Sequence, residues 1–198
     1  MNTHEAIEEL EFIKKVIDDT RNVIVDNGFS FIFWGIIIVI GLLSTYAAIL
    51  LDYNFPYAWN WILVIGFGWA YSLYSGYKHG KHAKVQTFSG KLLGAVWISA
   101  GISMTILGFV GTFAEAYHGV YISPLVSTIL GISFFISGFL YDKRWITYIS
   151  AGWWMGAIIM FIYPYLYTLL IMSAMMIVFQ IIPGIIIYRE SKKLKDAA

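Results

Sequence analysis

The chain has 198 residues, of which 59% are hydrophobic and only 13% are charged, and its formal net charge is +1. A soluble domain normally carries about a quarter of charged residues, so the composition excludes an ordinary soluble domain and predicts a membrane protein. The chain has no cysteine, which excludes disulfides, thiolate metal sites and a cysteine nucleophile.

The first 27 residues are mostly polar, with seven acids against three bases. Apolar side chains recur at helical spacing from Ala6 to Ile24, which predicts an amphipathic helix over residues 3–26. A helix lying on anionic lipid would carry Lys and Arg on its polar face. The acidic face instead favours contact with basic loops of the same chain, with a second copy in a homo-oligomer, or with a protein partner. Alternatively, the helix simply lengthens the first span into the cytoplasm.

Six apolar runs follow, each long enough to cross the hydrocarbon core of a bilayer as a helix. The predicted spans are residues 29–51, 57–77, 91–113, 121–141, 145–162 and 165–188. The expected fold class is therefore all-α, a polytopic membrane protein with six transmembrane helices arranged as three hairpins. A cytoplasmic amphipathic helix at 1–27 precedes the transmembrane domain at 28–188, and a basic tail at 189–198 follows it.

The basic residues predict the orientation of the spans. All 13 Lys and Arg residues lie before the first span, after the sixth, or in and beside the second and fourth connections. Because Lys and Arg are enriched in cytoplasmic loops, both termini are expected in the cytoplasm. Tyr53, Trp59 and Tyr163 lie at the opposite ends of the spans, as in an interfacial belt; an aromatic ligand cage is the alternative.

One apolar octet occurs twice, as WISAGISM (97–104) and YISAGWWM (148–155), with a weaker relative in FIFWGIII (31–38). A repeat of three helical hairpins would explain this pattern, as would chance similarity among apolar residues. Small residues let helix backbones approach closely. Glycines are therefore predicted to mark helix contacts at Gly35, Gly101, Gly108, Gly131, Gly138, Gly152 and Gly156.

No ionisable residue lies well inside a predicted span, which argues against a proton relay or a carboxylate metal site in the bilayer. Asn60, near the outer end of the second span, is expected to reach interfacial water. Gln180 lies deeper, three residues before Pro183, which lacks a backbone N–H and predicts a helix kink. Gln180 is expected to bond backbone freed by the kink or a neighbouring helix; contact with a transported solute is the alternative.

His79 and His82 lie three residues apart in YKHGKHAK (77–84) and could share a metal ion on a helix. No third ligand lies nearby in the sequence and the lysines would repel a cation, so a solvated basic loop is the preferred interpretation. No catalytic residue, cofactor, metal site or nucleic-acid partner is predicted.

The chain resembles a family of six-helix bacterial membrane proteins of the Bacteroidota type. The resemblance rests on the acidic N-terminal helix, FWG (33–35), YKHGKHAK and IIPGIIIY (181–188). Members of that family have no assigned activity, so the resemblance implies a fold but no mechanism. The segment LGISFFISGF (130–139) is also faintly similar to acid-resistance membrane proteins of the HdeD type.

The expected function is that of a non-enzymatic integral membrane protein acting through protein–protein contacts, in a regulatory or stress-related role. The contact surface would be the helix at residues 3–26, facing a cytoplasmic protein or another copy of the chain. The alternative is a small permease or channel for a neutral or apolar solute. A cavity crossing the bilayer midplane would favour the alternative.

Overall fold

The computed structural model describes residues 28–53, 56–82 and 88–196, and every regular element among them is a helix. This confirms the all-α expectation for that part of the chain, while the predicted N-terminal amphipathic helix lies outside it. The elements are α2 (Phe29–Leu50), α3 (Tyr57–His82), α4 (Phe88–Thr105), η1 (Ile106–Gly111), η2 (Gly119–Tyr121), α5 (Ile122–Leu140), α6 (Arg144–Ile162), α7 (Tyr167–Met176), η3 (Ile177–Ile181) and α8 (Ile182–Asp196).

Five helical segments are long and apolar enough to cross a membrane, which supports the membrane class. They are Phe29–Leu50, Ser89–Gly111, Gly119–Leu140, Arg144–Ile162 and Tyr167–Lys193. The remaining long helix, α3, has 26 residues but is rich in Trp and Tyr and contains Asn60, which lowers its hydropathy. Length alone would therefore let α3 span a bilayer, whereas its composition is less apolar than that of these five segments.

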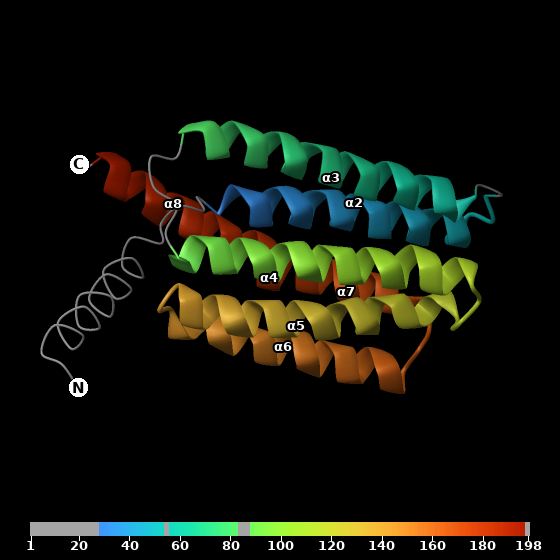
Figure 1. Ribbon diagram of the computed structural model, residues 1–198. Coiled ribbons are helices and arrows are strands. Elements are labelled where there is room, and N and C mark those ends of the chain that lie inside the picture. Colours follow the sequence, from blue (N-terminus) through green and yellow to red (C-terminus); the bar gives the residue numbers. More distant parts are fainter. Residues whose placement is uncertain (1–27, 54–55, 83–87, 197–198) are drawn as a thin grey trace, which may run out of the picture.

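The helices lie side by side in an elongated bundle, with the start of α2 and the end of α8 at the same end (Figure 1). The most extensive packing is between α5 and α6. Next to this pair lies α4, while α2 packs against α3 on one side and against α7, η3 and α8 on the other. The closest pair is thus α5 with α6, across the boundary between two predicted hairpins rather than within one.

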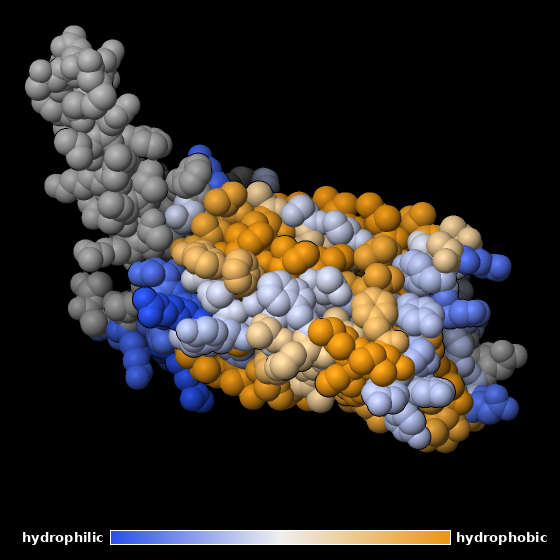
Figure 2. Space-filling model, turned by 90° about the horizontal axis from the view of Figure 1, so that it is seen from below, coloured by the Kyte–Doolittle hydropathy of each residue, from blue (hydrophilic) through white to orange (hydrophobic). Residues whose placement is uncertain are grey.

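The bundle has an apolar outer surface and an apolar core. Apolar side chains cover most of its length, and the most hydrophilic residues gather densely at the end that carries the last turns of α8 (Figure 2). Phe139 of α5, for example, is 66% exposed, as expected for a side chain that faces lipid. The buried core consists mainly of aromatic and Met side chains, among them Phe31, Phe134, Trp153, Met160, Met172 and Met176.

Three helices end in the same way, with a left-handed residue followed by a backbone hydrogen bond to the last helical turn. Left-handed backbone occurs two residues past α2 and α5, at Asp52 (φ 50°) and Asp142 (φ 52°), and two residues past the helical residues that continue η1 to Phe113, at Glu115 (φ 52°). The N–H of the next residue then bonds a carbonyl of the last helical turn, as in a Schellman motif. These bonds are Tyr53 N–H to Ala48, Ala116 N–H to Gly111 and Lys143 N–H to Gly138, at 2.9, 3.0 and 3.0 Å.

The two copies of the repeated octet are not equivalent in the structure. In α4, Ser99 is exposed and Ala100 is buried, whereas in α6 Ser150 is buried and Ala151 is exposed. The two helices therefore turn different faces of the same sequence toward the core. The same residues of the octet therefore make different contacts in α4 and in α6.

Candidate functional site in the buried core

The helix of the last predicted span is irregular just before Pro183. Residues Ile177–Ile181 form a π-helical turn, η3, where the sequence predicts a kink. Proline removes the N–H that would bond the carbonyl of Phe179, and in membranes such a gap is accommodated by local π adjustment of the backbone. π turns inside α-helices occur frequently at functional sites, so the side chains of η3 are of particular interest.

Gln180 is the fourth of the five residues of this turn and is only 3% exposed. Its neighbours in sequence contact different helices: Phe179 lies against Gly152 of α6, and Ile181 lies against Gly35 of α2. Gln180 is therefore buried on a turn that packs against both α2 and α6. Its Oε1 atom has no hydrogen-bond partner among the described residues. The expected bond to freed backbone or to a neighbouring helix is thus not made by this oxygen.

Trp153 of α6 is the second polar group of this interior. The residue is fully buried, with 0% exposure, and its indole Nε1 has no hydrogen-bond partner in the described part of the chain. Its ring centroid lies 5.9 Å from that of Phe179, the residue before Gln180, and 5.9 Å from that of Phe134. An unpaired donor and an unpaired acceptor therefore lie on two contacting elements, α6 and η3, within an aromatic surrounding.

Other buried polar side chains of the bundle do have hydrogen-bond partners, unlike Gln180 Oε1 and Trp153 Nε1. Ser127 Oγ donates to the Trp153 carbonyl at 2.7 Å and so joins α5 to α6. Further buried hydroxyls donate to carbonyls of their own helices, namely Ser133, Ser137, Ser150 and Ser173. Leaving a buried donor or acceptor unpaired costs about 1–3 kcal/mol, and water is absent from the hydrocarbon core. Gln180 and Trp153 are therefore the candidate site.

Most of the glycines predicted to mark helix contacts do lie against another helix. A Cβ atom on Gly138 would lie 2.5 Å from the backbone nitrogen of Thr147, so α5 and α6 approach at backbone distance. The glycines that face a side chain of another helix are Gly35 (Ile181), Gly101 (Trp69), Gly131 (Trp154), Gly152 (Phe179) and Gly156 (Met175).

Gly108 departs from the prediction. A Cβ atom there would meet no described atom within 4 Å, so this glycine marks no helix contact. It lies inside the π-helical turn η1, and its carbonyl accepts a hydrogen bond from Thr112 Oγ1 at 2.7 Å. Its role, like that of Thr112, is confined to the irregular end of its own helix.

Asn60, predicted to reach interfacial water, is half-buried and also makes hydrogen bonds to α2. Its Nδ2 donates toward α2, to the Gly41 carbonyl at 3.2 Å, Ser44 Oγ at 3.0 Å and Thr45 Oγ1 at 3.0 Å. Polar side chains commonly form hydrogen bonds between helices of membrane proteins. Asn60 therefore ties α3 to α2.

Sequence reasoning missed a set of contacts that we call the tryptophan clasps, in which an indole N–H donates to a hydroxyl on another helix. They join α2 to α3, α3 to α4 and α4 to α5, in chain order. The three bonds are Trp34 Nε1 to Ser72 Oγ (3.0 Å), Trp69 Nε1 to Thr105 Oγ1 (3.2 Å) and Trp97 Nε1 to Ser137 Oγ (3.1 Å). Two of the indoles lie against a glycine four residues before the hydroxyl, Gly68 and Gly101. In the sequence, these two contacts could have been predicted from a Gly-x-x-x-Ser/Thr pattern on one helix and a tryptophan on the preceding helix.

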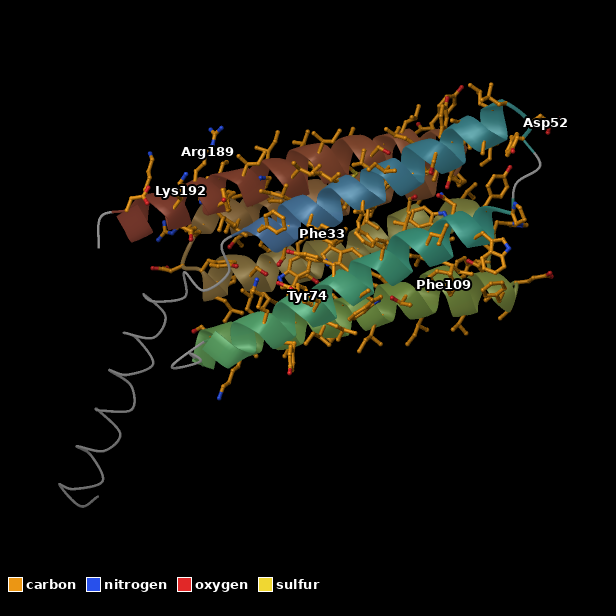
Figure 3. The ribbon with its side chains drawn as sticks, turned by 90° about the horizontal axis from the view of Figure 1, so that it is seen from above. Phe33, Asp52, Tyr74, Phe109, Arg189 and Lys192 are labelled. Carbon is orange, nitrogen blue, oxygen red and sulfur yellow. The ribbon has the colours of Figure 1, made fainter. Side chains whose placement is uncertain are left out.

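Described basic residues lie at one end of the bundle. Figure 3 shows Arg189 and Lys192 there and Asp52 at the opposite end. Lys143, in the turn between α5 and α6, forms an ion pair with Glu190 of α8. The described Lys and Arg side chains on elements that meet at this end are Lys78, Lys91, Lys143, Arg144, Arg189, Lys192 and Lys193. The side chains of His79 and His82 lie outside the described part.

At the other end, Tyr117 closes the irregular end of α4. It follows η1 in the chain, and its hydroxyl donates to the Leu107 carbonyl inside η1. Its ring lies against Gly111, which has no side chain to block it. Burial raises the pKa of the Tyr117 hydroxyl above its usual 10.0 because it disfavours the phenolate. The neutral hydroxyl thus satisfies a carbonyl of the π turn.

No family model, curated protein or solved structure matches the chain. The residues and their geometry therefore carry the functional inference.

Proposed function

We propose that the chain is a six-span protein of a bacterial inner membrane, with α3 as the additional span. The 26 residues of α3 correspond to about 39 Å of helix, more than the roughly 30 Å of a bilayer core. Trp and Tyr are tolerated toward the interfaces, and the Trp34 clasp and the Asn60 bonds hold α3 along α2.

The end of the bundle that carries the described Lys and Arg residues is proposed to face the cytoplasm. The support is the distribution of charge: these cations lie at the end that carries the last turns of α8 (Figure 3), and cytoplasmic ends are enriched in Lys and Arg. With an even number of spans, both termini then lie in the cytoplasm.

The function that this arrangement supports best is contact with a protein at the cytoplasmic end, without catalysis. The observation that carries it is the separation of charge from the core: the described Lys and Arg side chains gather at that end, where they are open to recognition by an acidic partner. The sequence adds an acidic segment at 3–26, complementary to the basic end. We propose that this segment mediates homo-oligomer formation or binds a cytoplasmic protein, in a regulatory or stress-related role.

Native mass spectrometry and cross-linking of the full chain in nanodiscs test this proposal. Wild type is compared with a chain lacking residues 2–26 and with the double variant Lys192→Ala/Lys193→Ala; Asp52→Ala, at the opposite end, is the matched control. Loss of an oligomer or of a cross-linked partner in the first two variants, but not in the control, is the expected result. If wild type is monomeric and without partner, or if the deletion changes nothing, the proposal is wrong.

A second candidate function, passage of a small neutral solute, is favoured by one observation, the unpaired Gln180 and Trp153 groups in the bundle interior. The test is stopped-flow light scattering of proteoliposomes with water, glycerol and urea. A rate above that of empty liposomes that falls in Gln180→Met, a variant of similar side-chain volume, would support this candidate. Rates equal to those of empty liposomes would refute it.

A further inference from the structure

Gln180 and Trp153 offer complementary hydrogen-bonding groups in the same interior. Gln180 Oε1 accepts and Trp153 Nε1 donates, both residues are more than nine-tenths buried, and neither atom has a partner among the described residues. The two side chains reach this interior from contacting elements, since the Trp153 ring packs on Phe179, the residue before Gln180.

The surroundings restrict what could pair with these atoms. The nearby core residues are aromatic, with Phe134 beside Trp153 at a centroid distance of 5.9 Å and Phe31 beside Phe134 at 5.6 Å. Their π faces accept alkyl groups but offer no counter-charge. No ionisable side chain stands among the buried residues of the described chain. A charged ligand would therefore lose its hydration without compensation, whereas a neutral group with one donor and one acceptor would satisfy both atoms.

A hydroxyl group has this chemistry. Its oxygen can accept from an indole N–H while its hydrogen donates to a carboxamide oxygen. Buried polar groups that lack a protein partner are commonly satisfied by a bound molecule such as ordered water, and a π turn widens the helix beside such groups. The hydroxyls of Ser127 and Ser173 cannot serve here, because each donates to a carbonyl elsewhere.

We propose that Gln180 and Trp153 form an internal binding site for one hydroxyl group, donated to Gln180 Oε1 and accepting from Trp153 Nε1. The hydroxyl belongs either to a water molecule held in the core or to a membrane-soluble alcohol whose apolar part lies against the aromatic side chains. This site deepens the solute-passage candidate by naming the ligand chemistry, and it is independent of the proposed protein contacts.

The test observes the indole N–H of Trp153 directly. The full chain is labelled with ¹⁵N-tryptophan and placed in nanodiscs, and Trp153→Phe identifies one resonance among the eight tryptophans. Cross-relaxation from that N–H is measured to water and then, after addition of 1-hexanol, to the alcohol methylene protons. Trp154 is the matched control, since it is the next residue and its Nε1 donates to the Thr128 carbonyl at 3.4 Å.

The expected result is a cross-peak from the Trp153 N–H that is lost in Gln180→Met, with the Trp154 resonance unchanged. A cross-peak to water that hexanol leaves intact identifies trapped water, and its replacement by a cross-peak to hexanol identifies an alcohol site. If Gln180→Met does not fold, Gln180→Asn is used instead. This variant keeps the amide but shortens the side chain by one methylene, and it is expected to weaken the cross-peak at least twofold.

The proposal is overturned if Trp153 shows no cross-peak to water or hexanol in wild type, or if the cross-peak survives both Gln180 substitutions unchanged. Because the spectrum reports binding without transport, the site can hold a hydroxyl even where proteoliposomes show no solute flux. In that case only the solute-passage candidate fails.

Discussion

The α5–α6 pair and the α2–α3 pair are each joined by a short connection, yet they are held together in different ways. Between α5 and α6 the backbones touch, with Gly138 against Thr147 and with Ser127 Oγ bonded to the Trp153 carbonyl. Between α2 and α3 the contact is made by side chains: the Trp34 clasp on Ser72 and the Asn60 bonds to α2.

The difference shows two solutions to one physical problem. Lipid tails are as apolar as leucine, so helices in a bilayer gain nothing from hiding apolar surface from one another. The α5–α6 pair gains dispersion energy from close approach across small residues. The α2–α3 pair keeps its bulky rings, such as Phe33 and Tyr71 with centroids 4.0 Å apart, and adds hydrogen bonds that have no competitor in lipid. A bundle can therefore combine a close-packed side and a side joined by hydrogen bonds.

The largest expected effect is that of Gly138→Ala, on the close-packed side. The added methyl would lie 2.5 Å from the Thr147 nitrogen and 2.8 Å from its Cα, and backbone atoms cannot move aside as a flexible side chain can. We expect a loss of about 3 kcal/mol in unfolding free energy, as for a strongly overpacked core, measured by steric trapping in bicelles.

Gly108→Ala is the matched control for that substitution. It places the same methyl where no described atom lies within 4 Å, and alanine is favoured over glycine in helices. Its stability should equal or slightly exceed that of wild type. Equal losses in both variants would mean that close approach of α5 and α6 is not what Gly138 provides.

The Trp34–Ser72 clasp should contribute less. Hydrogen bonds between membrane helices average about 0.6 kcal/mol and reach about 1.7 kcal/mol in double-mutant cycles. A cycle of Trp34→Phe and Ser72→Ala, measured in the same way, is expected to give a coupling energy in this range. Trp34→Phe combined with Thr105→Ala is the control, because Thr105 pairs with Trp69 instead. A coupling of zero for Trp34 with Ser72 would mean that this hydrogen bond does not stabilise the pair, leaving ring packing and the Asn60 bonds between α2 and α3.

This contrast between the two pairs could be predicted only in part from the sequence. Apolar runs of sufficient length predict membrane helices regardless of tertiary contacts, because every backbone group in lipid must be satisfied within a helix. The positions of α2, α5 and α6 therefore agree with the predicted spans to within a few residues. Glycines such as Gly138 and Gly152 also stand out in sequence, since small residues are what close approach requires.

What the sequence could not predict is which partner each residue meets. Gly101 and Gly152 occupy the same place in the repeated octet, yet one faces Trp69 of the preceding helix and the other Phe179 of η3. The rotation of each helix about its axis depends on all its neighbours together. For the same reason, Gln180 was identified as deep and polar, but the unpaired Nε1 of Trp153 had no sequence signal among eight tryptophans.

Tyr117 allows a smaller test of a hydrogen bond at the irregular end of α4. Tyr117→Phe removes the donor to Leu107, and we expect a loss of about 0.5–1 kcal/mol at pH 8. Because burial raises the folded-state pKa above the usual 10.0, this stability is fully present below pH 10 and is lost as pH rises through the raised pKa.

Melting curves of wild type and Tyr117→Phe in detergent, recorded from pH 8 to pH 11.5, measure the effect. The difference between their midpoints should shrink above pH 10, when the phenolate can no longer donate. A difference that stays constant across this range would show that the hydroxyl bond contributes nothing and that only ring packing on Gly111 matters.

The smallest expected effect is that of the Lys143–Glu190 ion pair, which joins the α5–α6 turn to α8. The two side chains are 32% and 44% exposed, so water and salt screen their attraction, and such pairs contribute about 0.5 kcal/mol or less. Glu190→Gln should therefore shift the melting midpoint by about a degree at low salt and not measurably at 1 M NaCl. A larger shift that persists in high salt would show that the α5–α6 side is stabilised by this ion pair as well as by close packing at glycine. The α5–α6 and α2–α3 pairs would then both depend on polar side-chain contacts.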